Sequence, residues 1–141
     1  MTPVQTVHAT AISLDGRGAL LRGASGSGKS ALALEMMAFG AALIADDRVI
    51  LSRASDSVIA ACPPALSGLI EARGLGLLRA GPAGPAPLCC VVDLDAVIAD
   101  RLPPRRHVTL LGCALPLLHR PAGVNLAPAL LQFLRWGWGD A

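Results

Sequence analysis

The stretch Gly23-Ala24-Ser25-Gly26-Ser27-Gly28-Lys29-Ser30 decides the fold expected for this chain. It has the pattern Gly, four residues, Gly-Lys-Ser, in which glycines let successive backbone N–H groups turn inward around a polyphosphate. In this chemistry Lys29 places a flexible positive charge at the outer phosphates, and the Ser30 hydroxyl ligates Mg²⁺. Lys29 is the only lysine among 12 basic residues. The pattern predicts nucleotide or pyrophosphate binding; the alternative is a glycine-rich turn that binds nothing, in a chain with 15 glycines.

The segments on either side of this stretch favour a phosphate-binding loop. Residues 18–22 form a short apolar run typical of a buried strand, and residues 30–39 combine strong helix formers with apolar residues at helical spacing. A helix that begins here would direct its free N–H groups and the positive end of its dipole toward the phosphates. The motif requires this order of strand, loop and helix.

The remaining pattern predicts an α/β fold: a phosphate-loop core with a mixed β-sheet. Residues 4–14 alternate imperfectly between apolar and polar, and Asp15-Gly16-Arg17-Gly18 supplies a turn, so a hairpin is expected over residues 4–22. Further strands are expected over residues 41–45, 49–51, 57–61, 88–94 and 108–118. A helical turn is expected within residues 66–73, a loop over residues 80–87 and a helix over residues 126–136, with Trp136 and Trp138 as packing residues.

Length and hydropathy predict one soluble domain. At 141 residues the chain can bury about two thirds of its unfolded surface. Hydrophobic residues make up 53% of it, but polar and charged residues interrupt the apolar runs before the roughly 18 residues that a membrane helix needs. The first residues have neither the positive start nor the apolar run of a secretory signal. We therefore expect a cytoplasmic protein that does not bind membranes.

Cysteine spacing and charge argue against two further kinds of site. The four cysteines show no Cys-x-x-Cys spacing, so we interpret them as reduced, buried small hydrophobes; they are Cys62, Cys89, Cys90 and Cys113. Net charge is only +2 and the arginines are scattered, which gives nucleic-acid binding little support. Aromatic residues make up 3% and tyrosine is absent, so a bound nucleotide would be held mainly by its phosphates, with loose base selectivity.

Two acidic segments supply candidate catalytic and metal-binding residues. Asp46 and Asp47 follow the strand expected over residues 41–45, a position at which a carboxylate holds Mg²⁺ or polarises a nucleophile. Adjacent strand residues face opposite ways, so the two are expected to have different roles; a turn with two solvated carboxylates is the alternative. The second segment, Glu71-Ala72-Arg73-Gly74-Leu75-Gly76, could hold metal and phosphate or form a surface ion pair.

Taken in order, these segments resemble motifs in the catalytic domain of the HPr kinase/phosphorylase family, bifunctional enzymes that phosphorylate a serine of the phosphocarrier protein HPr and remove that phosphate again. The similar segments are Val7-His8, residues 23–30, Gly40-Ala41-Ala42-Leu43-Ile44-Ala45-Asp46-Asp47, residues 71–76, Asp100-Arg101-Leu102 and Gly123-Val124-Asn125-Leu126-Ala127. The resemblance covers about residues 5–130. The Asp-Asp pair and the Arg-Gly-Leu-Gly segment, at a fixed distance from the loop, are far more specific than the loop alone.

The resemblance implies which residues bind the donor and its metal. Lys29 and the loop backbone would hold the phosphates of ATP, while Ser30 and Glu71 would hold Mg²⁺ and Asp46 would assist through water. Arg73, Gly74 and Gly76 belong to the same signature segment as Glu71.

The resemblance also implies the catalytic residues. Asp47 would be the base that takes the proton from the substrate serine and, in the reverse direction, activates inorganic phosphate to attack phosphoserine and release pyrophosphate. His8 would lie close to that base and tune it, and Arg101 would offset developing charge. Taken alone, an unplaced arginine such as Arg101 is more often a surface residue.

The resemblance further implies architecture and partners. The fold would resemble the nucleotide-binding fold of phosphoenolpyruvate carboxykinase, the protein substrate would be HPr or a relative, and the protein would be a homo-oligomer, which is a hexamer in the family. Because His8 lies at the start of the chain, we expect a single catalytic domain over residues 1–141, a short form without the N-terminal regulatory domain of longer members.

One departure bears on the activity. The family usually has arginine after the late glycine, in a segment associated with phosphorylase action, and this chain has Val124 there. Arg120, on the other side of Pro121, could compensate. Phosphorylation is therefore predicted more firmly than dephosphorylation. The alternatives are a small-molecule P-loop kinase that shares only the loop and a catalytically silent nucleotide- or phosphate-binding sensor.

Overall fold

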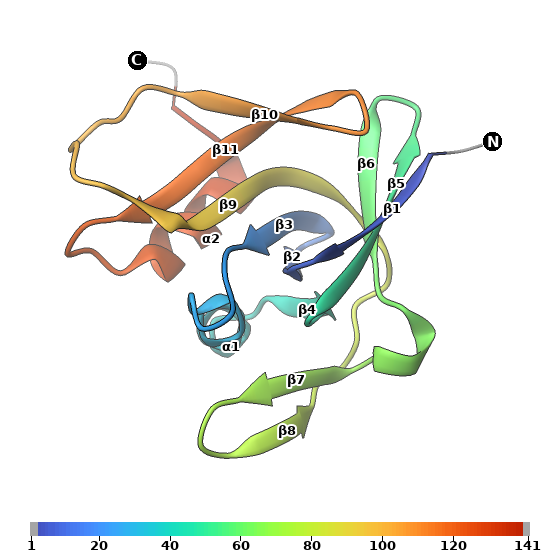
Figure 1. The fold of residues 1–141 in the computed structure, drawn as a ribbon. Coiled ribbons are helices and arrows are strands. Elements are labelled where there is room, and N and C mark those ends of the chain that lie inside the picture. The colour runs from blue at the N-terminus through green and yellow to red at the C-terminus, as the bar shows by residue number, and fades with distance from the viewer. Residues whose placement is uncertain (1–2, 140–141) are drawn as a thin grey trace.

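The computed structural model describes residues 3–139, which form a curled mixed sheet, a separate hairpin and two α-helices (Figure 1). The elements follow the chain as β1 Val4–His8, β2 Thr10–Leu14, β3 Arg17–Arg22, α1 Lys29–Ala38, β4 Ala42–Ala45, β5 Arg48–Ala54, β6 Ser57–Ala61, η1 Pro64–Leu66, β7 Leu69–Ala72, β8 Gly76–Arg79, β9 Ala86–Ile98, β10 Arg106–Leu110, β11 Cys113–Pro121 and α2 Leu126–Trp136. Within the described residues, nine strands join in one sheet and β7 and β8 form the hairpin. A mixed α/β fold is thereby confirmed.

The hairpin that leads into the glycine-rich loop consists of β2 and β3. Their antiparallel pairing ends at Leu14 and Arg17, and the two residues between them, Asp15 and Gly16, have φ angles of 52° and 79°. A two-residue turn with positive φ at both positions matches the right-handed twist of paired strands. The predicted hairpin is therefore confirmed for residues 10–22. It is wrong for residues 4–8, because β1 pairs instead with β5.

Strand β9 is the central strand of the sheet. It pairs in parallel with β3 on one side and with β11 on the other, and its first residues pair antiparallel with β6. Val92 lies opposite both Leu21 of β3 and Leu118 of β11. Because β9 makes these pairings over its whole length, it extends from residue 86 to residue 98, beyond the expected strand over residues 88–94.

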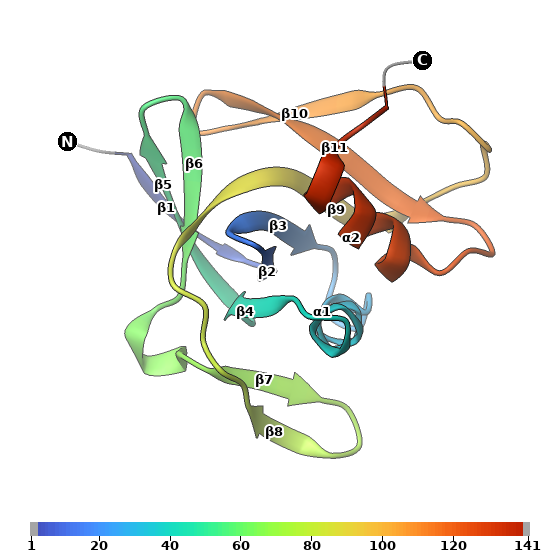
Figure 2. The same cartoon turned by 180° about the vertical axis from the view of Figure 1, so that it is seen from behind.

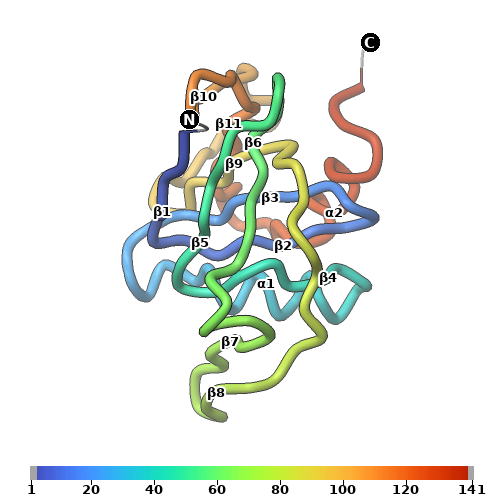
Figure 3. Tube along the Cα trace, turned by 90° about the vertical axis from the view of Figure 1, so that its right-hand side faces the viewer, coloured from blue at the N-terminus to red at the C-terminus, as the bar shows by residue number. Residues whose placement is uncertain are grey.

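Alternate residues of the central strands fill two cores on opposite faces of the sheet. Leu21 and Val92 pack in one cluster with Met36 of α1 and Leu130 of α2, whereas their neighbours Leu20 and Val91 belong to the other cluster. This follows from the strand geometry, in which successive side chains point to opposite faces. Figure 2 shows α1 and α2 on the same side of the sheet. Figure 3 shows β5 and β6 running across the direction of β2 and β3. The sheet curls there over the core that contains Leu20 and Val91.

Three further sequence predictions are corrected by the structure. The helical turn within residues 66–73 is wrong: η1 ends at Leu66, and β7 begins at Leu69 because its side chains alternate between buried and exposed and pair with β8. The single strand over residues 108–118 is two strands, because Leu111 and Gly112, with φ angles of 48° and 80°, form a turn between β10 and β11.

The third correction concerns the tryptophans. Trp136 is 78% exposed at the end of α2, so it is not a packing residue. Trp138 does pack: its ring lies edge-on to Phe133, with centroids 5.2 Å apart, and the Arg105 guanidinium lies 4.8 Å from its centroid. The helix that precedes it agrees with the expected residues 126–136, because Asn125 caps its first turn and accepts a hydrogen bond from the Ala127 N–H.

Over residues 3–139, neither helix is long and apolar enough to cross a membrane.

The reactivity of the cysteine thiols can be used to test whether the central strand β9 is buried. Cys90 and Cys113 are buried, Cys62 and Cys89 are half-buried, and all four are free. Burial, with a smaller contribution from Cys89, raises the pKa of Cys90 to about 12, and burial also raises the pKa of Cys62.

We expect iodoacetamide at about pH 8 to label Cys89 and Cys62 of the native protein well before Cys90 and Cys113, because alkylation requires an accessible thiolate. Labelling is followed by mass spectrometry of peptides, and in denaturant all four thiols should react at similar rates. Labelling of Cys90 in the native protein as fast as Cys89 would contradict a buried β9.

Candidate functional site

Residues 23–28, here called the glycine-rich loop, join the end of β3 to the start of α1. Two glycines make its path possible. Gly23 has φ of 153°, and a Cβ atom there would lie 2.6 Å from the Ser27 Oγ; Gly28 has φ of 99° and precedes the first residue of α1. The loop closes on itself through the Ser27 N–H, which donates to the Ala24 carbonyl at 2.9 Å. The expected order of strand, loop and helix is therefore present, and α1 directs its N-terminus toward the loop.

Lys29, at the start of α1, is 7% exposed. Its ammonium donates to the carbonyl oxygens of Gly23 and Ala24, at 2.8 and 3.1 Å. A buried ammonium loses its hydration, and these two carbonyl oxygens supply hydrogen bonds that offset that loss. The positive charge is therefore held beside the loop. A phosphate bound by the loop would meet this charge directly.

Two side chains from neighbouring strands hold the glycine-rich loop from outside. The Ala24 N–H donates to both carboxylate oxygens of Asp95 on β9, at 3.1 and 3.0 Å, and the Arg120 guanidinium on β11 donates to the Ser27 carbonyl at 2.5 Å. Asp95 is in turn oriented by Asp93, whose carboxylate accepts from the Asp95 N–H. The sequence analysis did not single out Asp95. A signal was present, since Asp95 follows the strand expected over residues 88–94, and parallel strands end at the same edge of a sheet.

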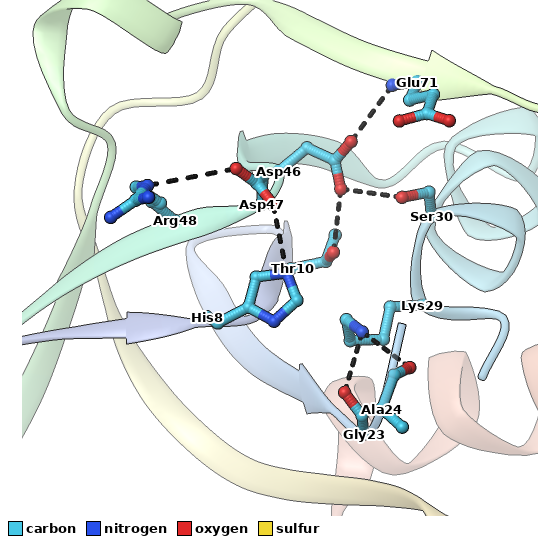
Figure 4. A network of polar contacts seen from close by, with 10 residues as sticks. All are labelled: His8, Thr10, Gly23, Ala24, Lys29, Ser30, Asp46, Asp47, Arg48 and Glu71. Carbon is cyan, nitrogen blue, oxygen red and sulfur yellow. Dashed lines mark hydrogen bonds and ion pairs between the residues drawn. The ribbon is translucent and has the colours of Figure 1, made fainter. Parts of the chain in front are cut away.

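Asp46 lies at the end of β4 and is 8% exposed (Figure 4). One of its carboxylate oxygens accepts hydrogen bonds from the hydroxyls of Thr10 on β2 and Ser30 on α1, both at 2.8 Å. The other accepts from the backbone N–H of Glu71 on β7 at 3.0 Å. Asp46 therefore joins three parts of the chain, and it turns the Ser30 hydroxyl oxygen toward the cavity beside the loop.

Asp47 lies in a different environment from Asp46. Its φ is 74°, and its side chain is 62% exposed (Figure 4). The His8 Nε2 lies 3.0 Å from one carboxylate oxygen, and the Arg48 Nε lies 3.9 Å from the other. An ionised carboxylate only accepts hydrogen bonds, so the His8 Nε2 carries the proton in this contact. Asp47 is thus an accessible carboxylate held in place by an imidazole.

These side chains face one cavity of about 570 Å³ beside the glycine-rich loop. Its walls come from β1, β2, the loop, α1, the end of β4 and β7; they are His8, Thr10, Ser25, Gly26, Gly28, Lys29, Ser30, Ala31, Leu34, Asp46, Asp47, Glu71, Ala72 and Arg73. Most of the predicted site residues are therefore brought together. The predicted residues that are not part of this wall are Gly23, Ala24 and Ser27 of the loop, Gly74 in the β7–β8 turn, Gly76 at the start of β8, and the exposed Arg101 in the segment between β9 and β10.

The cavity offers oxygen atoms of the kind that Mg²⁺ prefers. The Ser30 hydroxyl and the carboxylates of Asp46 and Glu71 come from adjacent elements around the start of α1 (Figure 4). Among residues 3–139, no group of three His, Cys, Asp or Glu side chains is arranged to hold a metal ion by itself. The donor set therefore fits a Mg²⁺ ion that arrives with phosphates, since Mg²⁺ is commonly bound by one or two carboxylates together with substrate oxygens.

Comparisons with known proteins agree with the resemblance seen in the sequence. The family model described as HPr Serine kinase C-terminal domain matches residues 1–81. An HPr kinase/phosphorylase of Bordetella pertussis is 49% identical over 79 residues, which cover 55% of this chain and 26% of that protein. An HPr kinase/phosphorylase of Burkholderia lata is 48% identical over 79 residues, covering 55% of this chain and 24% of that protein. The matched region thus spans about a quarter of each relative.

A solved structure extends the likeness to almost the whole chain. The structure of the Hpr(Ser) kinase/phosphatase from Coxiella burnetii matches with a TM-score of 0.77 at 23% identity, covering 93% of this chain and 88% of that one. It is similar in fold: a mixed α/β domain with a curled mixed sheet.

The two adjacent aspartates should differ in their effect on stability. We expect Asp46→Asn to lower the free energy of unfolding by about 1–3 kcal/mol, because an amide has one acceptor oxygen for three donors and at least one buried donor loses its partner. Asp47→Asn should stay within about 0.5 kcal/mol, since the side chain is exposed and asparagine tolerates positive φ. Urea unfolding measures both free energies. Equal losses of stability in the two variants would contradict the role of Asp46 in joining three parts of the chain.

The contact from β9 predicts a local effect on the glycine-rich loop. In Asp95→Ala the Ala24 N–H loses its carboxylate acceptor, so amide hydrogen exchange over residues 23–28 should become faster while exchange in α2 is unchanged. Asp100→Ala, an exposed aspartate beyond the end of β9, is the control and should leave the loop as it is. Unchanged exchange in Asp95→Ala would show that the loop does not depend on this contact.

Proposed function

The chain belongs to the family of HPr serine kinase C-terminal domains, and we propose that it transfers a phosphoryl group from ATP to a serine of the phosphocarrier protein HPr or a relative. In the reverse direction it removes that phosphate with inorganic phosphate, releasing pyrophosphate. The observation that carries the proposal is the exposed carboxylate of Asp47, held by His8 in the same cavity as Lys29 and Ser30. A general base, a phosphate-binding lysine and oxygen ligands for Mg²⁺ are the parts that phosphoryl transfer needs.

Asp47 acts as the base in both directions. In the forward reaction its carboxylate takes the proton of the serine hydroxyl as that oxygen forms a bond to the γ-phosphorus and the bond to the β-phosphate oxygen breaks, so that ADP leaves. In the reverse reaction it takes a proton from inorganic phosphate, whose oxygen attacks the phosphoserine phosphorus; the serine oxygen leaves, takes up a proton, and pyrophosphate is released. His8 donates to the carboxylate throughout and keeps it aimed into the cavity.

The glycine-rich loop and α1 bind the donor. The backbone N–H groups of the loop and the dipole of α1 attract the phosphates, and the Lys29 ammonium, 2.8 Å from the Gly23 carbonyl, can exchange that contact for a phosphate oxygen. Ser30 and Glu71 would hold Mg²⁺ directly and Asp46 through water. When bound, Mg²⁺ would neutralise charge on the transferred phosphate.

Two arginines bear on the proposed reaction, one on its phosphorylase direction and the other on the stabilisation of developing charge. Arg120 contacts the Ser27 carbonyl, so a guanidinium lies at the glycine-rich loop although residue 124 is valine. This supports the phosphorylase direction. Arg101 lies outside the cavity wall, so its proposed role in offsetting charge requires movement of the segment between β9 and β10 or contact with another copy in a homo-oligomer.

The test is the intact mass of HPr after incubation with the protein, ATP and Mg²⁺, followed by excess inorganic phosphate. We expect a gain of one phosphoryl group, which phosphate then removes. Asp47→Asn should lower the transfer rate by about a hundredfold or more and leave nucleotide binding nearly unchanged, because only the proton acceptor is lost.

Asp15→Asn is the matched control, since Asp15 is also an exposed aspartate with positive φ but lies in the β2–β3 turn. It should transfer phosphate like the unmodified protein. Binding of ATP without transfer to any phosphocarrier would refute the kinase proposal and favour the sensor, and turnover of ATP with small molecules alone would favour a small-molecule kinase.

A further inference from the structure

A second cavity, of about 360 Å³, lies on the other side of the glycine-rich loop. Its walls come from the loop, the outer face of α1, the end of β11 and the start of α2; they are Ser27, Gly28, Ala31, Leu32, Glu35, Arg120, Val124, Asn125 and Leu126. Gly28 and Ala31 line both cavities. The two spaces therefore meet at the loop and at the first turn of α1, where a polyphosphate would be held.

The larger cavity holds the reacting end of the donor and must also admit the acceptor. Asp47 and Ser30 both face it, so the transferred phosphate belongs there, and the serine of a protein has to reach the same point. A nucleoside in that cavity would compete with the acceptor for space. The remaining part of the donor therefore extends past Gly28 and Ala31 to the opposite side of the loop.

The second cavity has the chemistry of a nucleoside site. Leu32 and Leu126 are buried, and with Ala31 and Val124 they give it an apolar side. Its polar side has Glu35, one of whose carboxylate oxygens accepts from the Asn125 side-chain amide at 2.7 Å, which leaves the other as an acceptor for hydroxyls. A carboxylate is a recurrent partner of ribose hydroxyls in nucleotide sites.

The part of the second cavity closest to the loop suits a phosphate. Arg120 is the cationic residue in the wall of this cavity, and its guanidinium lies at the Ser27 carbonyl of the glycine-rich loop. A phosphate placed at this end of the cavity would gain a charge-assisted contact from it.

We propose that the second cavity binds the nucleoside of the donor, with ribose hydroxyls at Glu35, the base against Val124 and Leu126, and the nearest phosphate at Arg120. This rests on the proposed function, in which the donor is a nucleotide. Among the described residues, the wall of the second cavity includes no aromatic side chain, so the base is held by apolar contact without stacking on an aromatic ring. ADP and GDP should accordingly bind with similar affinity.

The test compares two ligands that share their phosphates and differ in the nucleoside. Calorimetry measures the dissociation constants of Mg²⁺–ADP and Mg²⁺–pyrophosphate for Val124→Trp, whose indole would fill the cavity. We expect ADP affinity to fall about tenfold or more, equivalent to the loss of roughly 1.4 kcal/mol, and pyrophosphate affinity to stay unchanged. Val124→Phe, with a smaller ring, should give an intermediate loss.

Val4→Trp is the matched control, because Val4 on β1 is 62% exposed and Val124 is 63% exposed, and Val4 is part of neither cavity wall. It should bind both ligands normally. Normal ADP affinity in folded Val124→Trp would overturn the nucleoside site while leaving the kinase intact. Equal losses for ADP and pyrophosphate would also overturn it, since the substitution would then act on the loop. If the unmodified protein binds pyrophosphate but not ADP, the nucleotide donor of the proposed function fails as well.

Discussion

The buried carboxylate of Asp46 is the contact on which the geometry of the site depends. The β2–β3 hairpin, the first turn of α1 and the β7–β8 hairpin are formed by separate parts of the chain, and each presents a donor to this one side chain. A carboxylate can satisfy all three because its two oxygens offer several acceptor positions. Among the described residues, the β7–β8 hairpin belongs to no larger sheet. It is held against α1 by the bond at Glu71 and by the buried Ile70, which packs in the same core cluster as Met36. Glu71, Arg73 and Ser30 face the same cavity as a result.

The sequence predicted the parts of the site whose signals are local. The glycine pattern, the apolar strand before it and the helix after it lie within about twenty residues, and the structure has all three elements. The helix at residues 126–136 was equally well defined, because a capping asparagine and an apolar periodicity mark it. Local segments had already marked Asp47 and Glu71 as candidates. The resemblance to a family added His8 and assigned the three residues to one site, which no short-range pattern would have done. They lie far apart in the chain and meet in one cavity wall.

Contacts that depend on tertiary pairing were not predicted. Asp95 reaches Ala24 only because β9 pairs in parallel with β3. The sequence indicated where each of these strands ends, but it did not specify that the two strands pair. The same reason explains the missed β7, since residues 69–72 become a strand through their partner β8 rather than through their own propensity. The family model matches residues 1–81, whereas β9, β11 and α2 follow that region. The side chains proposed for chemistry thus come largely from the matched part, and those that hold the loop come from the part after it.

The backbone conformation at Asp47 has an energetic cost that is separate from any role of its carboxylate. Four non-glycine residues among those described have positive φ; Asp15, Ser55 and Leu111 lie in the turns of hairpins, and Asp47 is the one that does not. A left-handed conformation costs an ordinary residue about 1 kcal/mol, and glycine avoids that cost. Glycine at this position would therefore relieve backbone strain, so the backbone conformation and the role we propose for the carboxylate favour different residues. Directed evolution for thermal tolerance, without a screen for phosphate transfer, would be drawn to this position and would remove the carboxylate that we propose as the base.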